Sequence, residues 1–272
     1  MVFGGYSPSP NTPQLAAGSF IEGSPMTQRA SVSARVLPID GILIINPRSF
    51  IERRQSIERQ LQSLGLTYEF IHTYDACDLD PATIQRYFRH PYPNTGNQSC
   101  CMKHLTAMRL VVDRHWHRAL ILEDDVILAP DFIQGVRDAI TESSAITRPH
   151  VVFIGSGGNF YTPKSMRVPG QRLYKAPKGR FTDSYILGAD TARLRVQWIE
   201  QQGITGPIDC HFDASDPKLG IEWYWLEEPV VEQGSKNGAF RSAIQSAPPN
   251  GIQRIKFWWE KVRRKHIYQL WR

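Results

Sequence analysis

One stretch decides the fold: Ala119-Leu120-Ile121-Leu122-Glu123-Asp124-Asp125. Its four apolar residues predict a buried strand, and three carboxylates follow the strand directly. Adjacent carboxylates repel one another unless a cation or solvent relieves them, and hard ions such as Mg²⁺ and Mn²⁺ prefer oxygen ligands. Alternation along an extended chain would place Glu123 and Asp125 on one side and Asp124 on the other. An acidic triplet alone favours a solvated turn, but a place at the C-terminal edge of a sheet favours a ligand site.

The chain before this strand alternates strands with helices. Residues 42–45 are apolar and predict a buried strand, and the capping-box form of residues 49–52 predicts a helix that Gly65 ends. A second strand is predicted at residues 68–71. This order is that of a βαβ unit. We therefore expect an α/β fold whose mostly parallel sheet is flanked by helices and binds ligands at the C-terminal ends of its strands.

The later part of the chain continues the alternation. The expected elements are a helix over about residues 100–114, strands at 151–154 and 184–187, and a helix capped by Asp190 that ends near Gln202. Residues 207–233 mix acids, aromatics and prolines and show no clear period.

The composition is that of an ordinary globular protein. Of 272 residues, 41% are hydrophobic and 21% are charged, which excludes collagen-like, disulfide-scaffold and wholly disordered classes. The net charge is +6, but residues 251–272 carry the whole excess and residues 1–250 sum to zero. A neutral body has no reason to attract polyanions, so we expect no nucleic-acid partner.

Three segments are expected along the chain. Residues 1–38 are rich in Ser, Gly and Pro and predict a flexible leader, and residues 39–240 predict the α/β domain. Residues 250–272 combine basic and aromatic side chains at helical spacing and predict an amphipathic helix. This helix favours peripheral contact with an anionic membrane, with docking on the body as the alternative.

The cellular location is expected to be cytoplasmic. No apolar run has the roughly 18 residues of a membrane-spanning helix, and no secretory signal is visible. The four cysteines show no CxxC spacing, which favours a reducing compartment. Together with the basic helix, this predicts a cytoplasmic protein that can associate with the inner face of the cell membrane.

Two further motifs carry possible chemistry. Asp209-Cys210-His211-Phe212-Asp213 offers a carboxylate for general-base work and an imidazole that could complete a metal shell, although taken alone it fits a surface loop equally well. The loop Gly155-Ser156-Gly157-Gly158 could hold a phosphate through its backbone amides. It lacks the Walker lysine, however, and favours a flexible turn.

These motifs, in this order over about residues 40–235, resemble glycosyltransferase family 25, which contains bacterial lipopolysaccharide galactosyltransferases and collagen galactosyltransferase domains. The family's Leu-x-Leu-Glu-Asp-Asp motif is matched fully at residues 120–125. Partial matches are Ile45-Asn46-Pro47-Arg48 with Arg53-Arg54, Ser99-Cys100-Cys101-Met102-Lys103-His104, Tyr185-Ile186-Leu187, Pro207-Ile208-Asp209 and Pro229-Val230-Val231-Glu232-Gln233. Lys103 stands where the family has serine, and Ser184 where it has alanine.

The resemblance implies a GT-A-like, Rossmann-like fold over residues 39–240 and an inverting transfer of a hexose, galactose favoured. The donor would be a UDP-sugar, and the acceptor a hydroxyl of a glycan, of a lipid-linked or lipopolysaccharide-type molecule or of another envelope component. Mn²⁺ or Mg²⁺ would neutralise charge on the departing diphosphate, and a carboxylate would take the acceptor's proton. The expected metal ligands are Glu123, Asp125 and His211; the expected base is Asp209, with Asp183 in reserve; the expected cofactor-binding residues are Asn46, Arg48, Arg53, Lys103, His104 and Asp124.

Two other functions fit part of the pattern. A sugar-phosphate nucleotidyltransferase also combines an α/β sheet, acids and a metal. It usually has a Gly-rich loop with Arg or Lys after its first strand, and Asn46-Pro47-Arg48 is not such a loop. A non-catalytic sugar-binding module could use the acids to hold calcium. Release of UDP from a UDP-sugar, with and without Mn²⁺, separates the three functions.

Overall fold

The computed structural model describes residues 37–89 and 94–234, together with residues 259 and 263. Nearly all of the predicted leader (1–38) and of the predicted C-terminal helix (250–272) lies outside these residues. Both stay predictions, and so does the membrane contact. None of the helices in the described part of the chain has the length and apolar composition that crossing a membrane requires.

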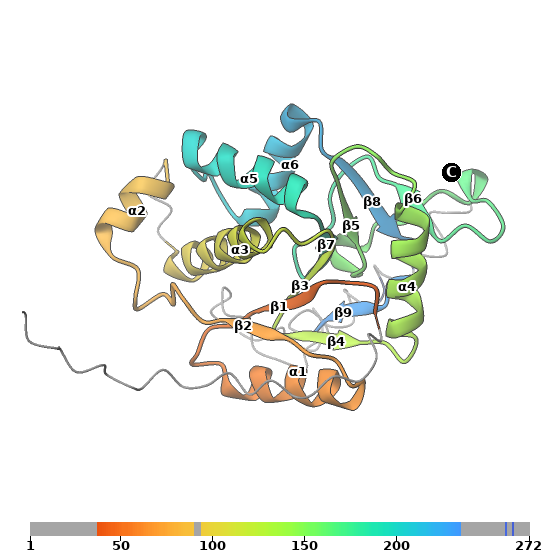
Figure 1. The fold of residues 1–272 in the computed structure, drawn as a ribbon, viewed down its shortest axis with the longest axis horizontal. Helices are drawn as coiled ribbons and strands as arrows, with labels where there is room; N and C mark the ends of the chain where they lie inside the picture. Colours follow the sequence, from red (N-terminus) through yellow and green to blue (C-terminus); the bar gives the residue numbers. More distant parts are fainter. Residues whose placement is uncertain (1–36, 90–93, 235–258, 260–262, 264–272) are drawn as a thin grey trace, which may run out of the picture. The chain divides into compact units, whose positions relative to one another are not determined.

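A mixed sheet forms the centre of the fold (Figure 1). In the described chain its seven strands lie in the order β2-β1-β3-β7-β5-β8-β6, and all but β6 and β7 point the same way. The strands are β1 (Gly41–Ile45), β2 (Glu69–Ile71), β3 (Ala119–Glu123), β5 (His150–Phe153), β6 (Leu173–Lys175), β7 (Ser184–Leu187) and β8 (Glu222–Leu226). A separate antiparallel pair joins β4 (Val126–Leu128) to β9 (Val231–Gln233). The expected mostly parallel α/β sheet is confirmed.

Helices cover both faces of this sheet (Figure 1). One face carries α3 (Thr95–Asp113), α5 (Ala189–Gln202) and α6 (Ile208–Leu219), and the other carries α1 (Ile51–Ser63) and α4 (Phe132–Ser143). In β3, Ala119 and Ile121 belong to the first hydrophobic core, whereas Leu120 and Leu122 belong to the second. Because side chains alternate along a strand, a continuous apolar run needs cover on both faces.

The starts of three helices differ from expectation. Phe50 is the N-cap of α1 and no side chain caps the helix, so the predicted capping box is not formed. Helix α3 begins earlier than expected, because the side chain of Asn94 accepts a hydrogen bond from the N–H of Asn97. Gly188, rather than Asp190, is the N-cap of α5. The apolar period locates a helix, but local cap chemistry sets its first residue.

Several elements were not predicted from the sequence. Residues 207–233 form α6, β8 and β9, and Pro217 inside α6 interrupts the pattern expected of a helix. Helix α4 is also additional, although Phe132, Val136 and Ile140 recur at helical spacing on its buried face. The short elements α2 (Pro81–Tyr87), β4 and β6 complete this set.

One edge of the sheet collects the ends of several strands. The parallel strands β1, β3 and β5 end there, and the antiparallel strand β7 begins there. Leu122 pairs with Ser184, so Glu123 and Asp183 lie opposite each other. The N–H of Glu123 donates to the carbonyl of Asp183 at 2.8 Å. The acidic end of β3 and the residue before β7 therefore meet at the C-terminal edge of the parallel strands.

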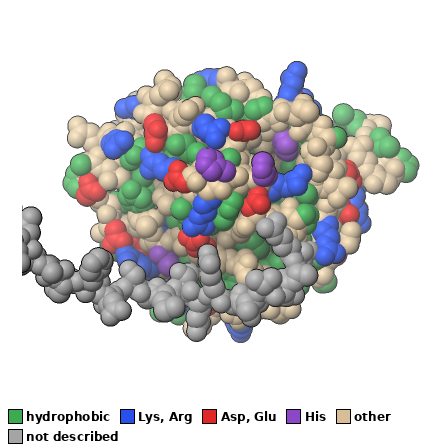
Figure 2. All heavy atoms as spheres, viewed as in Figure 1, with side chains coloured by type: hydrophobic (Ala, Val, Ile, Leu, Met, Phe, Trp, Pro, Cys, Tyr) green, Lys and Arg blue, Asp and Glu red, His purple; other side chains and the backbone are tan. Residues whose placement is uncertain are grey.

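Charges of both signs are interspersed on the face of the molecule that Figure 2 shows. On the face shown in Figure 2, Lys and Arg side chains alternate with Asp and Glu, and histidines gather near the centre of the view. This mixture agrees with the zero formal charge of residues 1–250.

Candidate active site

Three carboxylates, which we call the carboxylate cluster, lie at this edge: Glu123, Asp125 and Asp183. Glu123 ends β3, Asp125 lies in the turn that follows, and Asp183 directly precedes β7. Asp125 and Asp183 are 2% and 0% exposed, whereas the side chain of Glu123 is 21% exposed. The cluster is therefore reached from solvent on the Glu123 side.

Asp183 carries a poorly compensated charge. Its Oδ2 accepts a hydrogen bond from Ser184 Oγ at 3.2 Å, but its buried Oδ1 has no hydrogen-bond partner among the described residues. Burial, followed by the charges of Glu123 and Asp125, raises the pKa of the Asp183 carboxyl well above its ordinary value. A proton or a bound cation would relieve this charge.

The glycine loop after β5 makes room for Asp183. A Cβ on Gly155 would come within 2.2 Å of Asp183 Oδ2, and one on Gly157 within 2.7 Å of Asp183 Oδ1. The buried guanidinium of Arg180 fixes the loop by donating to the carbonyls of Gly155 at 2.8 Å and Phe160 at 2.5 Å. The loop is thus a close support for a carboxylate, whereas the sequence favoured a flexible turn.

Asp124 belongs to a buried polar network rather than to the cluster. Asn46 Nδ2 donates to its Oδ2 at 2.7 Å, and Arg53 Nη1 donates to its Oδ1 at 3.1 Å. Burial outweighs these bonds and raises the pKa of Asp124 to about 7. Arg53 Nη1 also lies 3.8 Å from Asp125 Oδ2, so the network supports the acidic turn from inside. This division of the triplet is the one expected from alternation.

Lys103 and Arg48 both bind Asp75. Lys103 is 1% exposed, and its Nζ lies 2.7 Å from Asp75 Oδ1, 2.8 Å from the carbonyl of Thr73 and 3.3 Å from that of Ile71. Three acceptors match three N–H groups, so a contact with diphosphate would require these bonds to break. Arg48 Nε donates to Asp75 Oδ2 at 2.8 Å and its Nη2 pairs with Asp78, yet its side chain is 55% exposed. Of the two cations, only Arg48 is open to a ligand.

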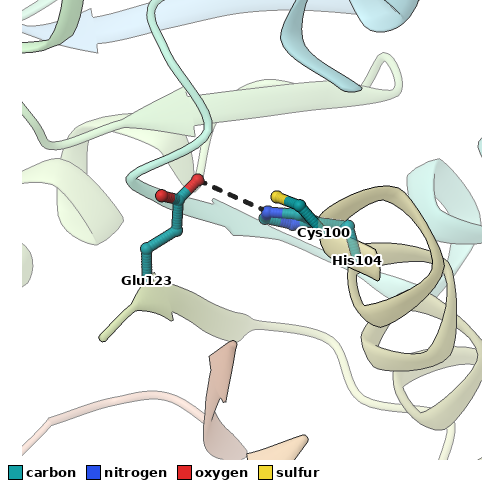
Figure 3. Close-up of side chains that lie close together, drawn as sticks. All are labelled: Cys100, His104 and Glu123. Carbon is teal, nitrogen blue, oxygen red and sulfur yellow. Dashed lines mark ion pairs between the residues drawn. The ribbon is translucent and has the colours of Figure 1, made fainter. Parts of the chain in front are cut away.

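His104 points toward the cluster together with an unexpected neighbour, Cys100 (Figure 3). Both side chains project from α3 toward Glu123, and His104 Nε2 lies 3.6 Å from Glu123 Oε1. His104 Nδ1 is hydrogen-bonded to the hydroxyl of Tyr185 at 2.9 Å. From the sequence, His104 was expected to face the diphosphate. The proximity of Cys100 to Glu123 was not predicted, because it depends on how α3 packs against the sheet.

His211 lies apart from the carboxylate cluster. It is buried on α6, where the charged groups that act on it are Asp216 and Arg195, and burial lowers its pKa to about 4. Within the described chain, one group of three or more Asp, Glu, His or Cys side chains has its ligand atoms within 4.8 Å of one another. That group is the one in Figure 3, so neither the expected shell of Glu123, Asp125 and His211 nor the three carboxylates of the cluster have all their ligand atoms this close together.

Asp209 lies in the first turn of α6, half-buried, beside the start of α3. Its Oδ1 accepts a hydrogen bond from the N–H of Cys210 at 2.8 Å. Burial, followed by the charges of Glu123 and then of Cys101 and Asp209, raises the pKa of the Cys100 thiol well above its ordinary value. Glu123 and Asp209 are thus both near enough to Cys100 for their negative charges to disfavour its thiolate.

Comparison with known proteins identifies one family. Residues 39–201 match the family model "Glycosyltransferase family 25 (LPS biosynthesis protein)". A "Glycosyltransferase 25 family member" of Drosophila pseudoobscura pseudoobscura is 23% identical over 130 residues, which are 44% of this chain and 21% of that protein. The matched region thus spans about a fifth of that relative's length.

Two solved structures resemble the fold at low identity. One is a Drosophila beta-1,4-galactosyltransferase 7 mutant in complex with manganese, UDP-Gal and xylobiose, with 9% identity, a TM-score of 0.41 and coverage of 78% of each chain. The other is a glycosyltransferase involved in the glycosylation of the major capsid of PBCV-1, with 9% identity, a TM-score of 0.38 and coverage of 80% of this chain and 99% of that one. The family model matches more than half of the sequence, and the chain belongs to glycosyltransferase family 25.

Proposed function

We propose that this chain transfers a hexose, galactose favoured, from a UDP-sugar to a hydroxyl of a glycan or envelope-type acceptor. The transfer would invert the anomeric carbon and depend on Mn²⁺ or Mg²⁺. One observation carries the proposal: in a family 25 chain, the carboxylate cluster lies at the sheet edge where open α/β sheets bind their ligands.

The residues of the cluster fit a hard divalent cation. Carboxylate oxygens are the ligands that Mg²⁺ and Mn²⁺ prefer, and the buried Asp183 Oδ1 lacks a hydrogen-bond partner among the described residues. When bound, the ion would neutralise negative charge on the departing diphosphate. Glu123, Asp125 and Asp183 would hold it either directly or through its bound waters, because their oxygens do not all lie within 4.8 Å of one another. The network of Asn46 and Arg53 would keep the acidic turn in place.

Asp209, rather than Asp183, is the proposed base. A general base must reach the acceptor hydroxyl, and Asp183 is 0% exposed and enclosed by Gly155 and Gly157. Asp209 is half-buried at the start of α6, with its carboxylate positioned by the hydrogen bond from Cys210. It would take the acceptor's proton as the hydroxyl attacks the anomeric carbon.

Arg48 is the proposed contact with the negatively charged donor. Its side chain is 55% exposed and lies at the C-terminal end of β1. Asn46 and Arg53, by contrast, are buried against Asp124. We therefore assign the donor contact to Arg48 and a supporting role to the other two residues.

A donor screen tests the function. UDP release is measured from a panel of UDP-sugars, with and without Mn²⁺ and a glycan acceptor, and the product is identified by mass spectrometry. We expect metal-dependent release from UDP-galactose. Consumption of a nucleoside triphosphate and a sugar phosphate would instead indicate the nucleotidyltransferase, and sugar binding without turnover would indicate the binding module.

The base assignment has its own test. Asp209→Asn should lower kcat at least about a hundredfold and leave UDP affinity unchanged, because the lost group acts only as the proton moves. Asp190→Asn, at an 88% exposed side chain on α5, is the matched control and should keep full activity. An equal loss of UDP binding and of rate in Asp209→Asn would contradict its role as the base.

A further inference from the structure

Cys100, His104 and Glu123 bring a thiol, an imidazole and a carboxylate to one point (Figure 3), and Glu123 also belongs to the carboxylate cluster. Cys100 and His104 are four residues apart on α3, so their side chains share one face of the helix. Glu123 comes from the end of β3. Their ligand atoms all lie within 4.8 Å of one another. No other group of three or more such side chains in the described chain is as tight.

The imidazole has an unused nitrogen that faces this point. His104 is 0% exposed, and its Nε2 has no hydrogen-bond partner among the described residues. At 3.6 Å, Glu123 Oε1 is too far for a hydrogen bond. His104 Nδ1 is bound to the Tyr185 hydroxyl at 2.9 Å. With its proton on Nδ1, the ring donates to Tyr185 and aims the Nε2 lone pair between Cys100 and Glu123, which is the usual arrangement of a metal-binding histidine.

The spacing of the ligand atoms and the types of donor indicate which ions the site would bind. Tetrahedral zinc has bonds of about 2.0–2.3 Å to nitrogen, oxygen and sulfur, so its ligand atoms are about 3.3–3.8 Å apart. The separation of His104 Nε2 and Glu123 Oε1, 3.6 Å, already falls in that range. A sulfur ligand selects soft and borderline ions over Mg²⁺ and Ca²⁺. Binding would release the thiol proton of Cys100 to solvent.

We propose that Cys100, His104 and Glu123 form a binding site for a thiophilic divalent cation such as Zn²⁺, with three protein ligands and an open fourth position. This site shares Glu123 with the proposed Mn²⁺ or Mg²⁺ site and differs from it in its other two ligands, Cys100 and His104. Occupation by Zn²⁺ should therefore inhibit transfer, and Cys100→Ser should relieve that inhibition. This last consequence rests on the proposed function, whereas cation binding does not.

Cobalt binding tests the site without any activity measurement. The full chain, freed of metal by a chelator, is titrated with Co²⁺, and the thiolate-to-cobalt charge-transfer absorption in the near ultraviolet is recorded. We expect one equivalent of Co²⁺ to give this band and Zn²⁺ to abolish it by displacement. The matched control is Cys210→Ser, which removes an exposed thiol on α6 and should leave the titration unchanged.

Cys100→Ser should lose the band and bind Co²⁺ at least about tenfold more weakly, since loss of even an outer-shell partner of a metal ligand costs that much. Circular dichroism confirms that each variant is folded. Absence of the band in the wild-type chain, or an equal band in folded Cys100→Ser, would overturn the proposal.

Discussion

Asp216 and Asp183 are both fully buried aspartates, yet their surroundings differ. Asp216 accepts two hydrogen bonds from Arg195, at 3.0 and 2.5 Å, and a third from Trp223 Nε1 at 2.8 Å. Arg195 in turn lies over the ring of Phe212, 3.7 Å from its centroid. Asp183 has one hydrogen bond, from the neutral hydroxyl of Ser184 at 3.2 Å, and two nearby carboxylates. The charge of Arg180 acts on it as well, but Arg180 donates its hydrogen bonds to backbone carbonyls.

The difference separates a charge that is compensated within the protein from one that, as we propose, a bound cation compensates. The bidentate pair compensates Asp216 within the protein and ties α5 to α6. Asp183 lacks such a partner, so its ionised form destabilises the metal-free fold. A chain keeps such a carboxylate where a ligand compensates it, and perturbed pKa values cluster at functional sites for this reason.

The largest expected effect follows from breaking the paired site. Arg195→Met leaves Asp216 buried without its cation, which should lower the free energy of unfolding by about 3–5 kcal/mol. Urea denaturation measures this. Arg193→Met, which removes an exposed partner of Asp190 on the same helix, is the control and should change stability by less than about 1 kcal/mol. Equal effects of the two substitutions would contradict the structural role of the buried pair.

The unpaired site should respond in the opposite way. Asp183→Asn removes a buried charge, so we expect the metal-free protein to be at least as stable as the wild type. Its turnover should nevertheless fall at least about a hundredfold, equal to about 2.7 kcal/mol in the activation barrier. Asp125→Asn should likewise remove metal-dependent turnover without unfolding the chain. Near-normal turnover in folded Asp183→Asn would contradict the role of Asp183 in holding the metal ion.

The pH dependence of stability sharpens the comparison. Asp124 has its pKa raised to about 7 from an ordinary 3.8. Its protonated form is favoured in the fold, so its stabilisation is complete below about pH 4 and is lost as the pH rises to about 7. In metal-free protein, the free energy of unfolding of the wild type should therefore fall by at least about 1.4 kcal/mol relative to that of Asp124→Asn between about pH 4 and 7. Urea denaturation at several pH values tests this, and a constant difference between the two proteins would contradict it.

His211 should make stability depend on pH in the opposite direction, so that stability falls as the pH is lowered. Its pKa is lowered to about 4 from 6.5, so its neutral form stabilises the fold above about pH 6.5 and this contribution is lost as the pH falls through 4. His211→Gln should flatten that part of the profile. The same denaturation series supplies the control for Asp124→Asn, since the two substitutions must change the slope with opposite signs.

The smallest expected effect concerns the support of the cluster. Thr182 Oγ1 donates to Glu123 Oε1 at 3.2 Å, and Thr182→Val removes this bond while conserving the side chain's shape. A hydrogen bond of about 0.5–1.5 kcal/mol corresponds to a roughly two- to tenfold rise in the Mn²⁺ concentration that gives half-maximal turnover. An unchanged metal requirement would show that Thr182 does not position Glu123.

Much of the fold followed from simple patterns. The apolar runs of β1, β3 and β7 and the periodic face of α1 identified those elements, and the end of β3 located the acidic edge. Helix α6 was missed because its proline and mixed charges obscure the period, and this also hid the burial of His211.

The site was predicted less completely, because its parts meet through tertiary packing. Asp183 comes to Glu123 only because β7 runs antiparallel beside β3, which no local pattern indicates. Lys103 carries a charge that suits diphosphate, but burial against Asp75 directs it inward. A sequence specifies the kind of group at a position; the packing of α3 and β7 determines what that group faces.

Metal binding by the cluster tests its proposed role most directly. Electron paramagnetic resonance detects free Mn²⁺ in titrations of the wild type, Asp183→Asn and Asp209→Asn. Asp209→Asn is the control, because it removes a carboxylate outside the cluster. We expect one bound Mn²⁺ in the wild type and in Asp209→Asn, and binding at least about tenfold weaker in folded Asp183→Asn. Wild-type affinity in Asp183→Asn, or no Mn²⁺ bound by the wild type, would contradict the assignment of the carboxylate cluster as the metal site.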